Sequence, residues 1–268
     1  MVVNPHTAAA IAQVVLYVPM VPLALYLLAR NWRYRPRTAW YPPAVFSTVR
    51  LVGGIVTIIE QQNQRNRGLI IATIILLNLG LIPLILAYLG YARLVLEHHF
   101  ADNRRLNILL RLIKIGVLVA AGFLGTAGGY AGQPEHADAQ SKLSRAAYTI
   151  FALALVVLIA SFIRLFLNLS QITPAHRTYV RWALVAAVPL CVRAAYGIIG
   201  VVVASGTNIL TSDWSPLFGS ATAFGLMALL PEYIVLSIYI FLSIYHLRTN
   251  KQEELIEERI KLESRDMS

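Results

Sequence analysis

Residues 69–91 read LIIATIILLNLGLIPLILAYLGY, and none of them carries a charge. A helix needs about 20 apolar residues to cross the hydrocarbon core of a membrane, which is about 30 Å thick. This stretch exceeds that length, so the sequence predicts a transmembrane helix here.

Six more apolar stretches of about this length occur in the 268-residue chain, some with one or two charged residues, and the seven together lie at residues 8–29, 41–59, 69–91, 106–129, 146–169, 179–205 and 218–245. Hydrophobic residues make up 57% of the chain and charged residues 13%, about half the share of roughly 25% that is typical of soluble domains. The sequence therefore predicts an all-α, polytopic membrane protein with seven transmembrane helices. We expect one seven-helix domain over residues 1–247 and a charged, helical, cytosolic tail over residues 248–268.

Lys and Arg gather at one set of helix ends. On one side of the membrane the helix ends carry only four of them: Arg65, Arg67, Lys142 and Arg145. Fourteen lie at the opposite ends: Arg30, Arg33, Arg35, Arg37, Arg93, Arg104, Arg105, Arg177, Arg181, Arg248, Lys251, Arg259, Lys261 and Arg265. Because Lys and Arg favour the cytosolic side, we expect the amino terminus outside and the carboxyl terminus in the cytosol. The positive charge then faces anionic lipid, and we expect no nucleic-acid partner.

Two opposite charges lie deep in the sixth and seventh stretches. Counted at 1.5 Å per residue from the cytosolic end, Arg193 is about 21 Å deep and Glu232 about 20 Å deep. A charge at such depth costs about 2.5 to 3.5 kcal/mol and is usually paired or functional. We predict an ion pair between Arg193 and Glu232, with Asn78 at similar depth as a candidate third member. The pair either locks two helices together or forms a site for a polar ligand or a proton.

Polar residues follow one face of two predicted helices. The spacing predicts that these faces look into the bundle, where they either form hydrogen bonds between helices or line a ligand site. In the seventh stretch the face comprises Gly225, Glu232, Tyr239, Ser243 and His246, and in the second it comprises Ser47, Arg50, Gly54 and Thr57.

Arg50, Lys114 and Arg164 lie about 8 to 14 Å from the cytosolic edge, with no acidic residue at comparable depth. Such side chains often extend to the headgroups, and they can also bind the phosphate of a lipid. Both interpretations stay open. Prolines coincide with the deeper charges, since Pro189 precedes Arg193 by one turn and Pro231 directly precedes Glu232. Each proline permits a kink in its helix.

Several short motifs carry a family resemblance: Asn4-Pro5-His6-Thr7, Ser47-Thr48-Val49-Arg50 with Gly53 and Gly54, and Asn78-Leu79-Gly80-Leu81-Ile82-Pro83-Leu84 followed by Leu89-Gly90. With them the chain resembles, over residues 4 to 247, a fungal family of seven-helix membrane proteins known only as a domain of unknown function. The resemblance implies a fungal source and one heptahelical domain. It supplies no ligand, reaction or catalytic residue.

Missing motifs narrow the function. No lysine lies between residues 218 and 245, which excludes a retinal Schiff base on the seventh helix. The chain lacks a His-Glu-x-x-His motif, a phosphate loop and a dinucleotide fingerprint, and the pair His98-His99 is expected in a solvated loop. We therefore expect no metal and no cofactor.

Three function classes remain. The first is a receptor-like or scaffolding protein of the plasma membrane or an endomembrane, with a lipid or small-molecule site in the bundle; its partners would be anionic lipid on the cytosolic side, a lipophilic small molecule or a second copy. Its ligand-binding residues would be Arg193, Glu232, Tyr239, Asn78 and Arg50, with Arg50, Lys114 and Arg164 as lipid-phosphate residues. The second class is a membrane-embedded enzyme, similar to terpene cyclases, with Glu232 as general acid. The third is a transporter. We favour the first, because an ion pair with Arg193 would keep Glu232 ionised.

Overall fold

The computed structural model describes residues 4–62, 66–99, 104–130, 133–204 and 219–266, and within these ranges the chain is helical with no strand. Seven helical spans in it are long and apolar enough to cross a membrane, which confirms the predicted class. The elements are α1 (Pro5–Asn31), α2 (Tyr41–Gln62), α3 (Arg67–Asn78), α4 (Leu81–His99), α5 (Arg104–Gly129), α6 (Ala137–Leu167), α7 (Pro174–Ala204), α8 (Ala221–Phe224) and α9 (Leu230–Asp266), with 3₁₀ turns at Arg37–Ala39, Pro134–His136 and Leu169–Gln171.

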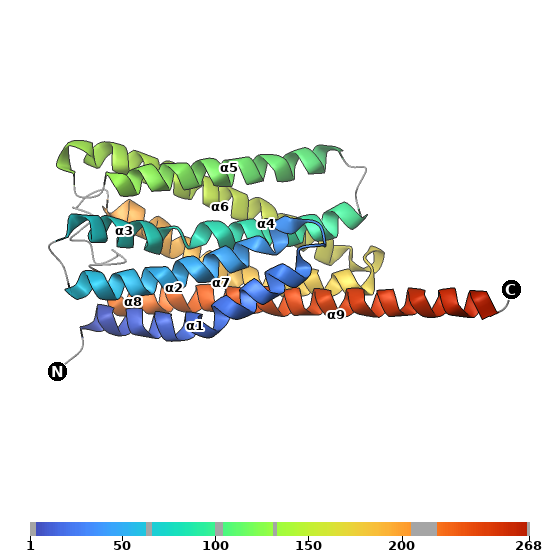
Figure 1. The fold of residues 1–268 in the computed structure, drawn as a ribbon. Coiled ribbons are helices and arrows are strands. Elements are labelled where there is room, and N and C mark those ends of the chain that lie inside the picture. The colour runs from blue at the N-terminus through green and yellow to red at the C-terminus, as the bar shows by residue number, and fades with distance from the viewer. Residues whose placement is uncertain (1–3, 63–65, 100–103, 131–132, 205–218, 267–268) are drawn as a thin grey trace.

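The helices run side by side, and the two termini lie at opposite ends of the bundle (Figure 1). Such an arrangement is expected of an odd number of spans. At one end, α9 extends well beyond the other helices (Figure 1). The tail predicted from residue 248 onward thus has a helical backbone continuous with α9 as far as Asp266.

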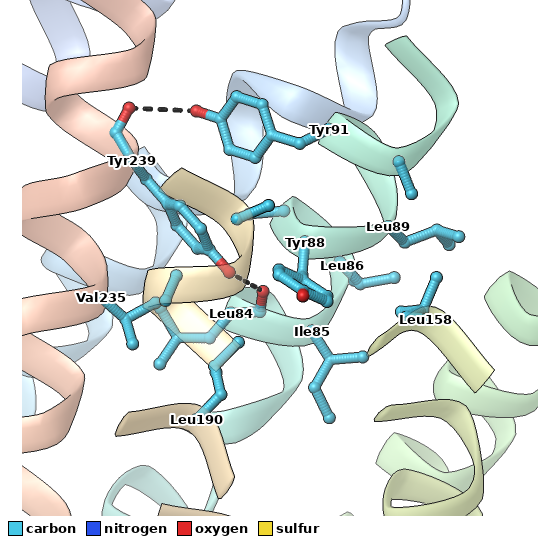
Figure 2. Close-up of a cluster of buried hydrophobic side chains, with 14 of the residues drawn as sticks. Leu84, Ile85, Leu86, Tyr88, Leu89, Tyr91, Leu158, Leu190, Val235 and Tyr239 are labelled. Carbon is cyan, nitrogen blue, oxygen red and sulfur yellow. Dashed lines mark hydrogen bonds between the residues drawn. The ribbon is translucent and has the colours of Figure 1, made fainter. Parts of the chain in front are cut away.

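The centre of the bundle is α4, which contacts α2, α5, α6, α7 and α9. Tyr88 and Tyr91 of α4 are fully buried, and so is Tyr239 of α9. The hydroxyl of Tyr239 donates to the carbonyl of Leu84 at 3.0 Å, and the hydroxyl of Tyr91 donates to the carbonyl of Tyr239 at 3.0 Å (Figure 2). These two hydrogen bonds fix α9 against α4.

The outer helices expose apolar side chains. Val15 of α1, Leu112 of α5 and Leu153 of α6 are each at least 60% exposed. In water such a surface would be unfavourable, but in a bilayer it contacts lipid chains of equal polarity. The exposed faces therefore agree with a membrane location.

The third span is interrupted, in contrast to the continuous helix predicted over residues 69–91. It consists of α3 and α4, separated by a turn at Leu79 and Gly80. The cause is Pro83, which has no N–H to give to the carbonyl of Leu79 and whose ring crowds that carbonyl. The Leu79 carbonyl instead accepts from the N–H of Ile82 at 3.2 Å.

The seventh span is also irregular. Between α8 and α9 the chain forms a π-helical turn, Gly225–Leu229, in which the N–H of Leu230 donates to the carbonyl of Gly225. Such turns are rare and lie mostly at functional sites. Pro231 stands two residues after this turn, and it has no N–H for a regular α-helical hydrogen bond one turn back. Both irregular spans thus deviate close to the same buried charges.

Candidate functional site

Three charged side chains meet in the core of the bundle: Arg50 of α2, Arg193 of α7 and Glu232 of α9. Glu232 Oε1 accepts from Arg193 Nε at 2.5 Å and also forms an ion pair with Arg50 Nη2. All three side chains are at least 98% buried. We call these residues the charge cluster.

The interruption between α3 and α4 makes room for the charge cluster. A Cβ atom on Gly80 would lie 2.8 Å from Glu232 Oε1 and closer still to the Arg50 guanidinium. Only glycine therefore fits this position without displacing the ion pairs. Beside the break, the carbonyl of Leu77 accepts from Arg193 Nη2 at 3.5 Å.

Helix α1, which packs against α2 and α9, also supports the charge cluster. Gln13 Nε2 donates to the backbone carbonyl of Arg50 at 2.6 Å. The ring of Tyr17, which is fully buried, packs edge-on against Phe46 at 5.8 Å and against Tyr233 at 6.1 Å between ring centroids. Phe46 in turn lies 5.8 Å from the Arg50 guanidinium carbon. Tyr17 thus borders the charge cluster.

The charge cluster is not neutral, and its polar atoms are not all paired. Two guanidinium groups face one carboxylate, and among the described side chains neither arginine has a second acidic partner. Among the described residues, four buried atoms in or beside the charge cluster have no hydrogen-bond partner: Arg50 Nε, Arg193 Nη1, Glu232 Oε2 and the Tyr17 hydroxyl. Buried polar atoms are usually paired with protein, water or a ligand. The site therefore has one excess positive charge and unused donors.

The predicted contact between Arg193 and Glu232 is confirmed, but the expectation that no acidic residue answers Arg50 is wrong. The depth count treated Arg50 as a residue of the cytosolic half. The long side chain of Arg50 lies on the interior face of α2 and from there reaches Glu232 of α9. The Arg50 side chain is buried and paired, and its role at a lipid phosphate stays a prediction.

Asn78 does not join the charge cluster through any hydrogen bond in the described part of the chain. Its Nδ2 donates to the carbonyl of Ile74 at 2.9 Å, and its Oδ1 accepts from the Tyr148 hydroxyl at 3.5 Å. Tyr239 lies on the same face as Glu232, but its hydroxyl is bonded to Leu84. Whether either residue binds a ligand stays a prediction.

The structure does not bring the other two lipid-phosphate candidates together with Arg50. Arg164 is exposed on α6 and Lys114 is half-buried on α5. Neither forms an ion pair among the described residues. Their role at a headgroup also stays a prediction.

The two polar faces look inward, as their spacing predicts. All the side chains of these faces are buried, while Gly225 is half-exposed and begins the π-helical turn. The buried side chains are Ser47, Arg50, Thr57, Glu232, Tyr239, Ser243 and His246.

Residues His98 and His99 end α4 and do not lie in a loop, so that expectation is wrong. Their side chains lie outside the described residues. Across the part of the chain that the structure describes, no three His, Cys, Asp or Glu side chains gather in a way that could hold a metal ion.

Sequence reasoning missed Gly80, Tyr17 and Gln13 as members of the site, because it searched the spans for charges. A signal for Gly80 was present, since it stands between Asn78 and Pro83 in the motif quoted above. Tyr17 and Gln13 lie one turn apart on one face of α1. That spacing alone does not indicate which helix they meet.

A family model with the description "Domain of unknown function (DUF7702)" matches residues 3–249. This range contains the first six spans, all but the last two residues of the seventh, and every residue of the charge cluster. No curated protein and no solved structure matches the chain.

Proposed function

The chain belongs to the family described as a domain of unknown function (DUF7702), and from its charge cluster we propose a receptor-like or scaffolding integral membrane protein that binds a lipophilic carboxylate inside the bundle. The observation that carries this proposal is the excess positive charge on Arg50 and Arg193, together with their unpartnered donors Arg50 Nε and Arg193 Nη1. One carboxylate would balance one charge and accept from both donors.

The surroundings favour an amphiphilic ligand over a small hydrophilic ion. Aromatic rings border the charge cluster, with the Arg193 guanidinium carbon 5.9 Å from the ring centroid of Tyr196. The cluster also lies within helices that are apolar enough to span a membrane. A carboxylate on an apolar chain suits both features. Its apolar chain can enter the apolar interior at little cost, whereas a small hydrophilic ion would first have to give up its hydration water.

The alternative in which Glu232 acts as a general acid is less well supported. A general acid must donate its proton to the substrate, so its carboxyl group must be within hydrogen-bond reach of the reacting atom. Here one oxygen of Glu232 is held by two guanidinium groups, and all three side chains are buried. We also propose, from the distribution of Lys and Arg, that the amino terminus faces out and the carboxyl terminus the cytosol.

The proposal is tested with laurate as the probe and methyl laurate as its uncharged match. Purified protein in lipid nanodiscs is heated with each compound, and the unfolding midpoint is measured. We expect laurate to stabilise the wild type, by about 2.7 kcal/mol at 100 times its Kd, and methyl laurate to have little effect.

Two variants make the test specific. Arg50→Gln removes the excess charge while Glu232 keeps Arg193 as its partner, so laurate should no longer stabilise this variant. Arg164→Gln removes an exposed charge on α6 and should respond as the wild type does. Equal stabilisation by methyl laurate, or an unchanged laurate effect in Arg50→Gln, would refute carboxylate binding at the charge cluster.

A further inference from the structure

A second site lies far from the charge cluster, between α1 and α9. A cavity of about 620 Å³ opens there, between the end of α1 and the part of α9 around Leu247. At this end of the bundle α9 extends beyond the other helices (Figure 1). Four cationic side chains line the cavity, two from the end of α1 and the residues just after it and two from α9: Arg30, Arg33, Arg248 and Lys251. We call this cavity the basic pocket.

The basic pocket has no compensating negative charge in the described structure. No acidic residue is among its lining residues, and none of its four cations has an ion pair with a described acidic side chain. All four are exposed. Arg30 Nε donates a hydrogen bond to the Tyr26 hydroxyl at 3.3 Å. Like charges around one cavity repel each other, and a ligand with several negative charges would relieve this repulsion.

The rest of the lining is apolar or aromatic. Leu27 of α1 is buried in the wall of the basic pocket, and Ile244 and Leu247 of α9 lie opposite it. Tyr26 and Tyr34 complete the lining near the cations. A cationic rim beside an apolar wall matches an amphiphile with an anionic head, and the volume lies within the range of about 300 to 1,000 Å³ found for small-molecule sites.

We propose that the basic pocket binds the headgroup of a phosphorylated membrane lipid that carries more than one phosphate, such as an inositol bisphosphate lipid. Four cations suit clustered phosphates better than a single charge, and basic pockets between transmembrane helices bind headgroups of this kind. The first span ends at Asn31 and the last at Lys251, among the residues that line the pocket, so the pocket lies where headgroups lie. The site is independent of the ligand proposed for the charge cluster.

The test measures binding of a short-chain phosphatidylinositol bisphosphate to the purified full chain in phosphatidylcholine nanodiscs. Each cation near a membrane surface contributes about a fivefold change in affinity. The double variant Arg33→Gln/Arg248→Gln should therefore bind this lipid about 25-fold more weakly than the wild type. Its unfolding midpoint without the lipid should stay unchanged, because both side chains are exposed.

The matched control is Arg104→Gln/Arg105→Gln. These residues are exposed in the first turn of α5, at the same end of the bundle but outside the basic pocket (Figure 1). The control variant should bind the lipid as the wild type does. Equal weakening in the two double variants would show that the lipid responds only to the total positive charge at this end of the bundle, and this result would overturn the proposal. Equal affinity for the free inositol phosphate headgroup and for the lipid would overturn the assignment to a membrane lipid.

Discussion

Glu232 is the residue on which the interior of this protein depends most. Its carboxylate is the shared partner of Arg50 and Arg193, and all three side chains are buried. Removing one partner of a buried ion pair costs about 3 to 5 kcal/mol, because the remaining charge is left without compensation. The three members of the charge cluster differ, however, in what their removal leaves behind.

We expect Glu232→Gln to be the most destabilising single change in the charge cluster, by about 3 to 5 kcal/mol, because it leaves two positive charges together. Arg50→Gln should cost less, since Glu232 keeps Arg193 as its partner. Chemical unfolding in detergent measures both values. A variant with Glu232→Gln, Arg50→Met and Arg193→Met should be more stable than Glu232→Gln alone, because no buried charge remains. Equal losses in Arg50→Gln and Glu232→Gln would contradict this account of charge balance.

Two irregular elements surround the charge cluster, the break between α3 and α4 and the π-helical turn before α9. The first places Gly80 against the ion pairs, and the second sets the rotation of Glu232 around α9. Each has a proline close to it, Pro83 in one and Pro231 in the other. Interrupted backbone in the core of a membrane protein occurs where protein or a polar cavity surrounds it. The elements thus indicate the same location as the charges do.

We expect Gly80→Ala to destabilise the protein by about 1 to 3 kcal/mol, the usual cost of overpacking a filled site. The added methyl group would displace the Arg50 guanidinium or Glu232 Oε1. The matched control is Gly122→Ala in α5, where nothing lies within 4 Å of an added Cβ. The control should have an unchanged or slightly higher unfolding midpoint in detergent. Two variants with the same midpoint would show that Gly80 does not hold the charge cluster in place.

In the whole molecule, positive charge is concentrated at one end of the bundle. The described cations near the end of α1, the start of α5 and the basic pocket lie at the end from which α9 extends (Figure 1). The amino terminus lies at the other end. If this distribution sets orientation by the usual preference of Lys and Arg, the long end of α9 enters the cytosol.

Reporter fusions test the orientation. Reporters after Trp40, Thr173 and Ser268 should be cytosolic, because Lys and Arg gather at these helix ends, and a reporter after Gln133 should be outside. Selective labelling or reporter activity in intact cells reads out each position. A reporter at Ser268 found outside would contradict the predicted orientation, although it would leave the seven-span fold unchanged.

The number of spans and the presence of deep charges could be predicted from the sequence. Span length and apolar composition are properties of contiguous residues, so the stretch 69–91 can be recognised as a membrane span without knowledge of what packs around it. The depth of Arg193 and Glu232 follows from counting along regular helices, and this sufficed to predict that they meet. The inward faces of the second and seventh spans follow from helical spacing alone.

Only the tertiary structure decided which further side chains reach Glu232. The count along straight helices did not predict that Arg50 meets Glu232, and it offered Asn78 as a third member, whereas Asn78 bonds to Ile74 and Tyr148. Contact depends on helix rotation, on bends and on the reach of each side chain. One extra residue in a helical turn rotates everything after it by about 100°. The π-helical turn before Glu232 and the break at Gly80 bring about such changes, and they take their final form only when the helices pack against each other.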